Sequence, residues 1–480
     1  MELSWRRCFG YKIDWRRLFL LIPIFTVFWC VLQIFVHTYV IPPNKHLHFR
    51  HETDSSLYRS SNSTIRSNEF LKGAILQEAH LTFPYSVVSP NSTNKFVQSV
   101  SVEQDIVDTR AQRKKDKNVA NTIVSSGKQT DIRLLSPTEA LVYARKEIDH
   151  ATFVNEDLNL YAPLFRNVSV FKRSYELMET TLKVYIYRDG ARPIFHNASL
   201  KGIYASEGWF MKLMEENKQF VTKDPDRAHL FYLPYSARQM EVALYVPGSH
   251  DLKPLSIYLR DYVNKIAAKY PFWNRTHGSD HFLVACHDWG PYTVTGHKEL
   301  ARNTIKALCN ADLSERVFVA GRDVSLPETT VRTPRRPLRY LGGNKASLRP
   351  ILAFFAGSMH GRVRPTLLKY WGGEKDMKIY KRLPLRVSKK MTYIQHMKSN
   401  NFVLPLSEVL DWSAFSVVVA EKDIPRLKEI LLSIPMRKYV AMQNNVKMVQ
   451  KHFLWNPKPT RYDLFHMILH SIWFNKLNQI

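Results

Sequence analysis

The chain has 480 residues and a formal net charge of +27 at pH 7, with 45% hydrophobic and 12% aromatic residues. This length gives room for two or three domains, and the apolar content excludes a disordered polymer. The positive charge favours phosphorylated small molecules, anionic lipid or nucleic acid as partners. Because the sequence has no zinc-finger spacing, RNP motif or heptad repeat, we expect no nucleic-acid partner.

The first forty residues predict a membrane anchor. Residues 18–36 carry no charge and are about as long as the roughly 20 residues that cross a bilayer. The positive-inside rule places the N-terminus in the cytosol, because five basic residues precede this stretch: Arg6, Arg7, Lys12, Arg16 and Arg17. No small-residue cleavage site follows, although a cleaved signal peptide is the alternative. We therefore expect a cytosolic tail (1–17), a transmembrane signal anchor (18–40) and a lumenal remainder.

A lumenal location permits N-glycosylation of sequons and disulfide bonds between cysteines. Five N-x-S/T sequons predict N-glycosylation at Asn62, Asn91, Asn167, Asn197 and Asn274. Of the four cysteines, Cys286 and Cys309 would lie in the lumen. A disulfide between them is permitted there, and two buried free thiols are an equal alternative.

A flexible stem is predicted between the anchor and the first ordered domain. Residues 41–135 are rich in Ser, Asn, Thr and scattered charge and have no sustained periodicity. Order returns at Ser136, where the sequence Ser-Pro-Thr-Glu is a capping box with proline at the first helical position. This pattern predicts a helix that ends near Asp149.

Strand and helix patterns alternate after this helix. Strands are predicted at 183–187, 229–233, 281–285 and 316–319, and helices at 206–216, 254–269 and 297–308. The alternation predicts an α/β domain over 136–345 with a mainly parallel, doubly wound sheet. Residues 332–350 read as a proline-rich linker.

A second α/β unit is predicted over 346–480. Its strands are expected at 351–356, 378–380 and 415–419, and its last helix, at 461–474, is apolar on one face and expected to dock across the first domain. Three strands are few for a doubly wound nucleotide-binding half.

The second unit opens with a strand, a glycine turn and a helix, at 351–373. The first amides of a helix lack partners and point at an anion, so Gly357, Ser358 and Gly361 predict a phosphate-binding turn. Arg364 is able to grip a phosphate bidentately. The alternative is a structural turn with solvated arginines, because the spacing is neither a Walker loop nor GxGxxG.

Several blocks of the sequence resemble plant exostosin-type proteins, glycosyltransferase family forty-seven. They include YASEGWF (204–210), DHFLVACHDWGPY (280–292), GRDVSLPET (321–329) and HFLWNPKPTRYDLFHMILHSIW (452–473). The resemblance covers nearly everything after residue 136. It implies a GT-B fold, with two facing Rossmann-like domains of which the C-terminal one binds a nucleotide sugar.

The same resemblance implies a function and a location. Family members are type II Golgi membrane proteins that transfer a sugar, with inversion, to a cell-wall polysaccharide or a related glycan. The expected partners are therefore a nucleotide sugar, a glycan acceptor, the Golgi membrane and other glycosyltransferases. No cofactor beyond the donor substrate and no essential metal are expected.

One departure from the family pattern lies between Ser399 and Asn401. Relatives carry about thirty further residues there, the length of a βαβ unit, and that block is expected to hold the nucleotide and ribose. We therefore expect an incomplete donor-binding half and impaired activity, through alternative splicing or a faulty gene model. The alternative is a non-catalytic, membrane-anchored relative that binds glycan or partner enzymes.

Candidates for the general base follow the strand at 281–285. His287 and Asp288 lead, because the carboxyl ends of strands face the cleft in α/β sheets and both side chains have acid–base chemistry. Asp288 as a turn cap and His287 as a core residue are the alternatives. Glu207 is a weaker candidate, because an acidic residue at a helix start usually serves the helix dipole.

The resemblance also assigns residues to the departing diphosphate. It implies that Arg364 and the amides from Gly357 to Gly361 bind the diphosphate, with His360 as a further donor or a structural turn residue. The sequence 224–226, Asp-Pro-Asp, is similar to a metal-binding DxD motif, but a turn is favoured. Three tryptophans are candidates for stacking on sugar rings, with core packing as the alternative: Trp209, Trp289 and Trp412.

Overall fold

The structure is a computed structural model that describes residues 132–152, 159–338, 351–359, 361–382 and 402–480. The predictions for the cytosolic tail, the membrane anchor, the stem up to residue 131, Asn62, Asn91 and His360 lie outside the described residues. Within those described ranges, no helix is both long and apolar enough to cross a membrane.

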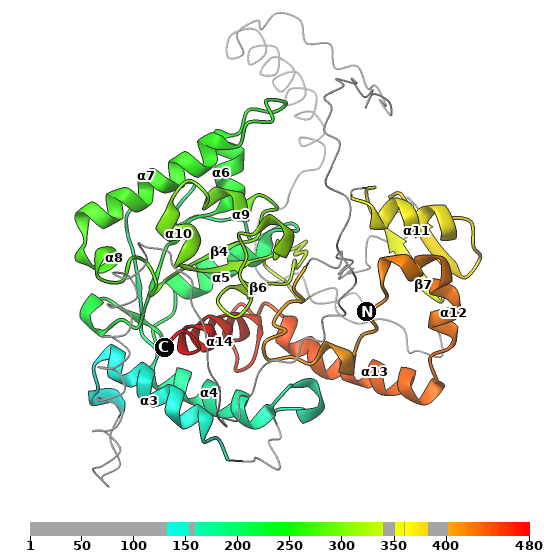
Figure 1. Ribbon diagram of the computed structural model, residues 1–480, viewed down its shortest axis with the longest axis horizontal. Helices are drawn as coiled ribbons and strands as arrows, with labels where there is room; N and C mark the ends of the chain where they lie inside the picture. Colours follow the sequence, from blue (N-terminus) through cyan, green and yellow to red (C-terminus); the bar gives the residue numbers. More distant parts are fainter. Residues whose placement is uncertain (1–131, 153–158, 339–350, 360, 383–401) are drawn as a thin grey trace, which may run out of the picture. The chain divides into compact units, whose positions relative to one another are not determined.

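A six-stranded parallel sheet forms the centre of the larger domain (Figure 1). Its strand order is β2-β1-β3-β4-β5-β6, and all five pairings are parallel. The strands are β1 (Val184–Ile186), β2 (Val221–Thr222), β3 (Leu230–Tyr232), β4 (His281–Ala285), β5 (Ile305–Leu308) and β6 (Val324–Ser325). This architecture confirms the predicted α/β domain with a parallel sheet.

Helices precede the first strand and form most of the crossovers between parallel strands, which need long connections that are usually helical. They are α3 (Pro137–Asp149), α4 (Val168–Thr181), α5 (Ala205–Glu215), α6 (Ala237–Leu244), α7 (Lys253–Lys269), α8 (Pro271–Thr276), α9 (Gly290–Thr293) and α10 (Lys298–Arg302). The predicted capping box is confirmed at the start of α3, where the Glu139 amide donates to Ser136 Oγ and the Ser136 amide donates to Glu139 Oε2. Short 3₁₀ turns complete this part at Ile132–Leu134, Ala162–Leu164, Pro225–Arg227 and Leu313–Glu315.

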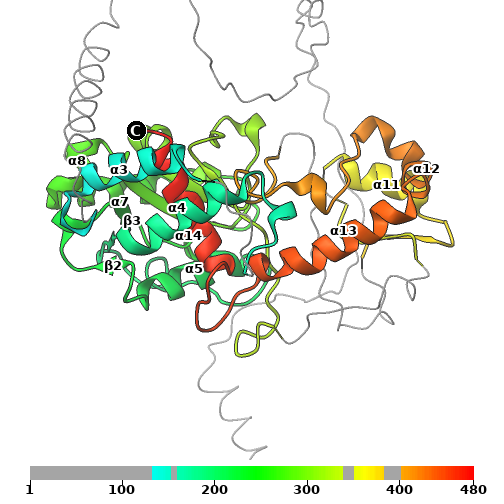
Figure 2. The same ribbon diagram turned by 90° about the horizontal axis from the view of Figure 1, so that it is seen from below.

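The sheet separates two hydrophobic cores because side chains alternate along each strand. In β4, Phe282 and Val284 face the first core, whereas Leu283 and Ala285 face the second. Residues of α3, α4 and α5 belong to the first core, and residues of α6 and α7 belong to the second. Figure 2 shows α3, α4 and α5 from the side of the first core.

The C-terminal helix α14 (Leu464–Leu477) packs in the first core, which confirms the docking predicted for it. His470 Nε2 lies 2.6 Å from Ser174 Oγ of α4, and Asn475 Nδ2 donates to the Asp323 carbonyl beside β6 at 3.1 Å. The prediction of a single apolar face is wrong, because buried residues occur all round the helix. A helix that is enclosed on all sides is a core element rather than a surface helix.

The helix predicted at 297–308 is wrong in its second half. The helix α10 ends at Arg302, and residues 305–308 form β5, paired with β4 through four residues. Local periodicity does not distinguish a short buried helix from a buried strand. Here the open edge of β4 supplies hydrogen-bond partners that a continued helix would leave unused, so tertiary pairing decides the outcome.

The strands predicted at 316–319 and 415–419 do not form. The amide and carbonyl of Val319 bond to Asp323 instead, at 2.8 Å each, and so are unavailable to a ladder. Beyond the 3₁₀ turn Trp412–Ala414, the amides of Phe415 and Ser416 bond back to the Trp412 carbonyl. Turn hydrogen bonds have therefore replaced sheet hydrogen bonds in both places.

A second, smaller group of elements is formed by residues from 351 onward. The strands β7 (Ala353–Ala356) and β8 (Met377–Tyr380) pair in parallel, and α11 (Val363–Trp371) lies between them in the chain. The 3₁₀ turn Glu421–Arg426, α12 (Leu427–Leu432), α13 (Met436–Val449) and the 3₁₀ turn Gln450–Phe453 follow. Among the described residues from 351 to 480, β7 and β8 are the only strands in a sheet. The hydrophobic cluster here has five buried residues: Phe355, Leu367, Met377, Ile379 and Ile424.

Candidate active site

A pocket of about 350 Å³ opens next to the carboxyl ends of β3 and β4. It is lined by the loop before α5, by the first turn of α5 and by the start of α6: Ser199, Lys201, Gly202, Ile203, Tyr204, Glu207 and Arg238. Ligands of open α/β sheets bind at the carboxyl ends of the strands. The pocket therefore lies where a substrate site is expected.

Glu207 joins the segments that follow two neighbouring strands. Its carboxylate accepts a hydrogen bond from the hydroxyl of Ser236, which follows β3, and another from the amide of Cys286, which follows β4, at 2.9 Å. The Arg238 amide is a third donor, at 3.4 Å. The side chain is only 1% exposed. Sequence reasoning ranked Glu207 below Asp288, because these donors come from distant segments of the chain.

Burial raises the pKa of Glu207 to about 7, although hydrogen bonds from Ser236 and Cys286 act in the opposite direction. Desolvation disfavours the charged form of a carboxyl group, and hydrogen bonds to that form stabilise it. A carboxyl group with a pKa near neutrality is suited to accept a proton from a substrate hydroxyl and to release it again.

His287 lies at the same edge with its ring largely buried. Its Nδ1 accepts a hydrogen bond from the Trp289 amide at 3.1 Å, so the neutral ring carries its proton on Nε2. Burial lowers the pKa of His287, which keeps the ring neutral at pH 7. In this state the ring donates a hydrogen bond through Nε2.

Asp288 is exposed beside Tyr204. Burial, followed by the negative charge and hydrogen bond of Asp288, raises the pKa of the Tyr204 hydroxyl. The ring of Tyr204 lies 4.6 Å from that of His287, measured between centroids. The structure thus brings all three sequence-predicted candidates, Glu207, His287 and Asp288, to one edge of the sheet. Sequence reasoning missed Tyr204, Ser236 and Arg238, for which the available signal was their position next to helix starts and strand ends.

A disulfide joins Cys286 and Cys309, which settles the alternative that the sequence left open. The two residues directly follow the paired strands β4 and β5. The bond therefore fixes the strand ends beside Glu207, and it holds the Cys286 amide that donates to this carboxylate.

The predicted phosphate turn has the strand–turn–helix arrangement that the sequence indicated. β7 ends at Ala356, Gly361 has a positive φ of 63°, and α11 begins at Val363. The Gly357 amide donates to the Tyr380 carbonyl at 3.2 Å, so it belongs to the β7–β8 ladder. Arg364 Nη1 donates to the Ser358 carbonyl at 3.1 Å. The role of this turn in binding phosphate stays a prediction.

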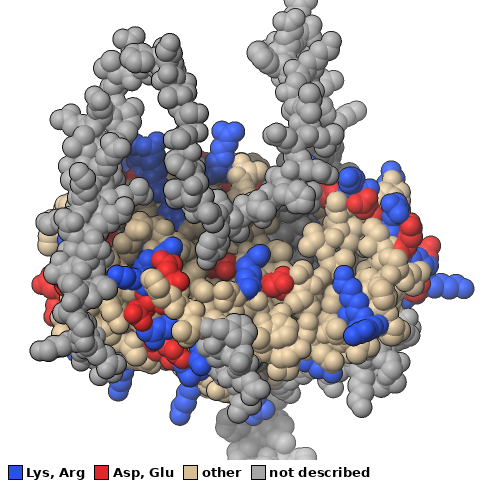
Figure 3. Space-filling model, turned by 60° about the horizontal axis from the view of Figure 1, so that its bottom comes forward, with Lys and Arg blue, Asp and Glu red and all other residues tan. Residues whose placement is uncertain are grey.

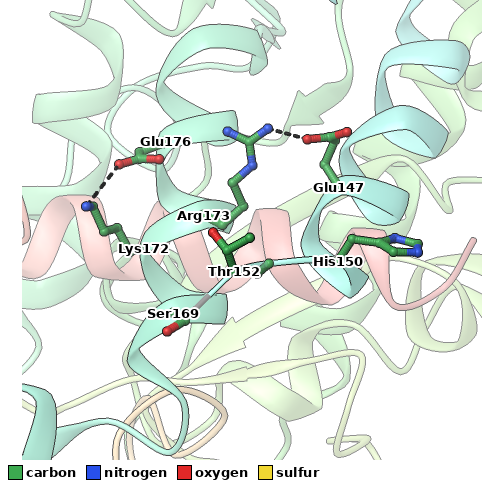
Figure 4. Close-up of a pocket in the computed structure, with 8 residues that line it drawn as sticks. Glu147, His150, Thr152, Ser169, Lys172, Arg173 and Glu176 are labelled. Carbon is green, nitrogen blue, oxygen red and sulfur yellow. Dashed lines mark hydrogen bonds and ion pairs between the residues drawn. The ribbon is translucent and has the colours of Figure 1, made fainter. Parts of the chain in front are cut away.

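A second pocket, of about 370 Å³, lies between α3 and α4 (Figure 4). Arg173 pairs there with Glu147, and Lys172 lies 3.9 Å from Glu176. The two cations are thus balanced by carboxylates, and the pocket is built by helices and the segment after α3 rather than by strand ends. The pocket at Glu207 is the better candidate for the active site.

The remaining sequence candidates have structural surroundings. Asp224 caps the 3₁₀ turn Pro225–Arg227 and accepts from the Asp226 amide, which confirms the turn. Trp209 is buried in the first core, whereas Trp289 is half-buried.

In the part of the chain that the structure describes, no three His, Cys, Asp or Glu side chains are grouped as metal ligands. On the face in Figure 3, described Lys and Arg side chains are interspersed with Asp and Glu.

Comparisons with known proteins give the family. The exostosin GT47 domain matches residues 178–404. A probable glycosyltransferase of Arabidopsis thaliana is 42% identical over 348 residues, which cover 66% of this chain and 66% of that protein. Another is 36% identical over 434 residues, 82% of this chain and 88% of that protein. A probable β-1,4-xylosyltransferase of the same species is 25% identical over 358 residues, 61% of this chain and 81% of that protein.

The first of these alignments is longer than the part of this chain that enters it. A share of 66% of 480 residues is about 317 residues, whereas the alignment runs over 348. About 30 aligned positions, the difference between 348 and 317, have no counterpart in this chain. This is the length that the sequence analysis assigned to the segment missing between Ser399 and Asn401. The chain also spans about two thirds of the length of this relative. With the domain match and relatives at 36% and 42% identity, the chain belongs to the exostosin GT47 family of glycosyltransferases.

Proposed function

We propose that the protein is a Golgi type II membrane glycosyltransferase of GT-B architecture, in which Glu207 activates the acceptor. It would transfer a sugar, with inversion, from a nucleotide sugar to a cell-wall polysaccharide or a related glycan. The observation that carries the proposal is the buried Glu207 carboxyl in a pocket at the carboxyl edge of the sheet, with its pKa raised to about 7. The name of one relative, the probable β-1,4-xylosyltransferase of Arabidopsis thaliana, supports a glycan acceptor.

The transfer reaction consists of three changes at the reacting atoms. The acceptor hydroxyl oxygen forms a bond to the anomeric carbon, its proton passes to Glu207, and the bond from that carbon to the diphosphate oxygen breaks with its electron pair. A base positioned at the hydroxyl contributes typically about 10²–10⁴-fold to the rate. His287, which donates through Nε2, and Asp288, which accepts, are placed to orient acceptor hydroxyls. Asp288 is the alternative base.

The donor is assigned to the second group of elements. Arg364 and the turn from Ser358 to Gly361 bind the diphosphate in this proposal, where Arg364 supplies positive charge to the leaving group. In this proposal the chain as it stands lacks the contacts to base and ribose, because the segment expected between Ser399 and Asn401 is missing. Losing several charge-assisted hydrogen bonds, each worth about 1.5–3 kcal/mol, weakens donor binding by orders of magnitude, since about 1.4 kcal/mol is tenfold.

Two forms of the protein test this proposal. One is the full chain as it stands, and the other carries the aligned segment of the Arabidopsis relative inserted between Ser399 and Asn401 (the restored chain). We expect donor binding and sugar transfer from the restored chain only. In the restored chain, Glu207→Gln abolishes transfer with donor binding unchanged, whereas Arg364→Ala weakens both. Normal transfer by the chain as it stands would overturn the proposed impairment, and full activity of Glu207→Gln would overturn the choice of base.

A second candidate function is a non-catalytic, membrane-anchored glycan-binding protein. The two-stranded sheet of β7 and β8 among the described residues favours it, because nucleotide-binding halves are usually built on larger sheets. Absence of nucleotide-sugar binding by both forms of the protein would favour this function.

The proposed location has its own test. The uncharged stretch at 18–36 and the five sequons support it, and the three sequon asparagines in described segments, Asn167, Asn197 and Asn274, are exposed. Endoglycosidase treatment of the expressed protein should increase its gel mobility. No shift with any glycosidase, or protease sensitivity of the C-terminal part in sealed microsomes, would contradict a lumenal C-terminus.

A further inference from the structure

We infer that the protein binds its acceptor as an extended glycan chain, along an aromatic row that begins at the Glu207 pocket. The aromatic row consists of Tyr204, His287, Trp289 and Tyr245. The inference rests on the proposed function, since it assigns further residues to the acceptor side of the same site. It adds subsites beyond the sugar that reacts, and it predicts that acceptor length determines affinity.

Ring contacts connect the four residues without a break. Tyr204 lines the pocket together with Glu207, and its ring centroid lies 4.6 Å from that of His287. The His287 ring is 5.2 Å from Trp289 in an edge-on arrangement. Trp289 is in turn 4.7 Å from Tyr245, again edge-on. A contiguous aromatic surface therefore connects the candidate base with the loop that follows α6.

The aromatic row lies at the margin of the two hydrophobic cores: Tyr204 packs against the first core, and Trp289 and Tyr245 pack against the second. His287 is buried, whereas Tyr204, Trp289 and Tyr245 are each only half-buried and keep part of their surface exposed. Two exposed apolar side chains lie near Tyr245 in the chain: Val242 of α6 is 61% exposed, and Val246, which directly follows Tyr245, is 66% exposed. Pockets for organic ligands typically combine such aromatic walls with a few placed polar groups.

Polar atoms accompany the apolar faces. The exposed Asp288 carboxylate lies between His287 and Trp289 in the chain. Tyrosine and tryptophan offer a large rigid apolar face and a polar tip. Sugars present the complementary chemistry, with C–H groups on their faces and hydroxyls at their edges. A neutral or weakly charged chain of pyranose rings fits this surface.

Glycan binding by the full-length protein, without donor, tests the inference. The probes are defined fragments of xylan, xyloglucan, galactan, mannan and homogalacturonan, each as disaccharides up to hexasaccharides. We expect affinity for one series to rise with length. Trp289→Ala and Tyr245→Ala each weaken binding of the longest fragment by about tenfold, as for aromatic hot spots. They leave binding of the shortest fragment nearly unchanged, and Trp289→Phe retains most of the affinity.

The matched control is Tyr370→Ala, which removes a 45%-exposed aromatic ring from α11. This variant should bind all fragments like the unaltered protein. Because Tyr245 follows α6 on a loop, its variant keeps the test valid if Trp289→Ala alters the fold.

Three outcomes would overturn the inference: no binding to any fragment, affinity independent of length, or an equal loss in Tyr370→Ala. The proposed function fails separately. Length-dependent binding that requires Trp289, together with no sugar transfer by the restored chain, would contradict the proposed enzymatic function but support the aromatic row as a glycan-binding site. Sugar transfer that is insensitive to acceptor length and to Trp289→Ala would support the enzymatic function but contradict the role of the aromatic row.

Discussion

Glu207 is the titratable residue on which the proposed chemistry depends, and its burial links activity to stability. Its pKa is about 7 in the folded protein, against an ordinary value of 4.5. Between these two pH values the folded state binds more protons than the unfolded state, so the free energy of unfolding decreases as pH rises. A base must be ionised to accept a proton, so turnover of the restored chain should increase over the same pH range.

The variant Glu207→Gln should remove the pH dependence of stability. Denaturant unfolding of the variant and of the unaltered protein at about pH 5 and about pH 8 measures this effect. Sugar transfer by the restored chain with Glu207 intact, over the same pH range, measures the pH dependence of turnover. Asp288→Asn is the control for stability, because its carboxylate is exposed. An unfolding free energy of Glu207→Gln that changes with pH as in the unaltered protein would show that another group causes the dependence.

Gly208 permits the close approach that shapes the pocket. A Cβ at this position would overlap the carbonyl oxygen of Ser199 and lie 2.7 Å from its carbonyl carbon. Because these are backbone atoms, the loop that lines the pocket would have to move. We expect Gly208→Ala to reduce the free energy of unfolding by about 1–3 kcal/mol, as overpacking does. Gly373→Ala, with open space around the added atom, is the control. Equal stability of the two variants would contradict this account.

Whether a site residue could be predicted from the sequence depended on where its hydrogen-bond partners lie in the chain. His287 and Asp288 were found because they follow a strand of five buried residues, which the sequence marks clearly. Glu207 was ranked too low because Ser236 and Cys286 are 29 and 79 positions away in the chain. A helix start is visible in sequence, whereas desolvation by distant segments is not.

Among the elements, α14 makes the largest single contribution to the first core. Trp473 is fully buried there, next to His229 at 6.3 Å between ring centroids. Replacing a buried tryptophan by alanine removes apolar contacts and leaves a cavity, so Trp473→Ala should cost about 3–5 kcal/mol. Thermal or denaturant unfolding measures this loss. Gln479→Ala, on the exposed residues after the helix, is the control. A loss below that of an ordinary surface substitution would show that the helix is dispensable.

Element-scale predictions succeeded where periodicity and length agreed. The strand at 281–285, the capped helix α3 and the long helix α7 follow the sequence pattern closely. β5 was predicted as helix, because its strand state depends on pairing with β4, from which α9 and α10 separate it in the chain. The strand predicted at 316–319 was lost to local hydrogen bonds of Asp323. Where the hydrophobic pattern did not distinguish helix, strand and turn, strand pairing and turn-forming side chains therefore decided the secondary structure.

At the scale of the whole molecule, the sequence predicted the α/β class and the short supply of strands after residue 346. It did not predict that α14 would be enclosed by the first core. The reason is physical: an apolar helix is equally compatible with a surface position and with a buried one, and the surrounding segments determine which occurs. The two sheets are therefore stabilised by different amounts of hydrophobic core. The two large cores cover both faces of the six-stranded sheet, whereas β7 and β8 share a cluster of five buried residues.

The smaller hydrophobic core of the second group of elements predicts where a protease cleaves the protein first. Apolar side chains in the second group remain open to water, with Val418 79%, Leu432 64% and Met436 73% exposed. Each Å² of apolar surface left exposed forgoes roughly 25 cal/mol, against a total stability of about 5–15 kcal/mol for a domain. Limited proteolysis with mass spectrometry should therefore cut the described segments 361–382 and 402–449 well before 159–338. Insertion of the relative's segment between Ser399 and Asn401 should slow these cuts and leave the rate within 159–338 unchanged. A single cooperative unfolding transition, with both parts equally protected in the chain as it stands, would mean that the second group has the support it needs without that segment.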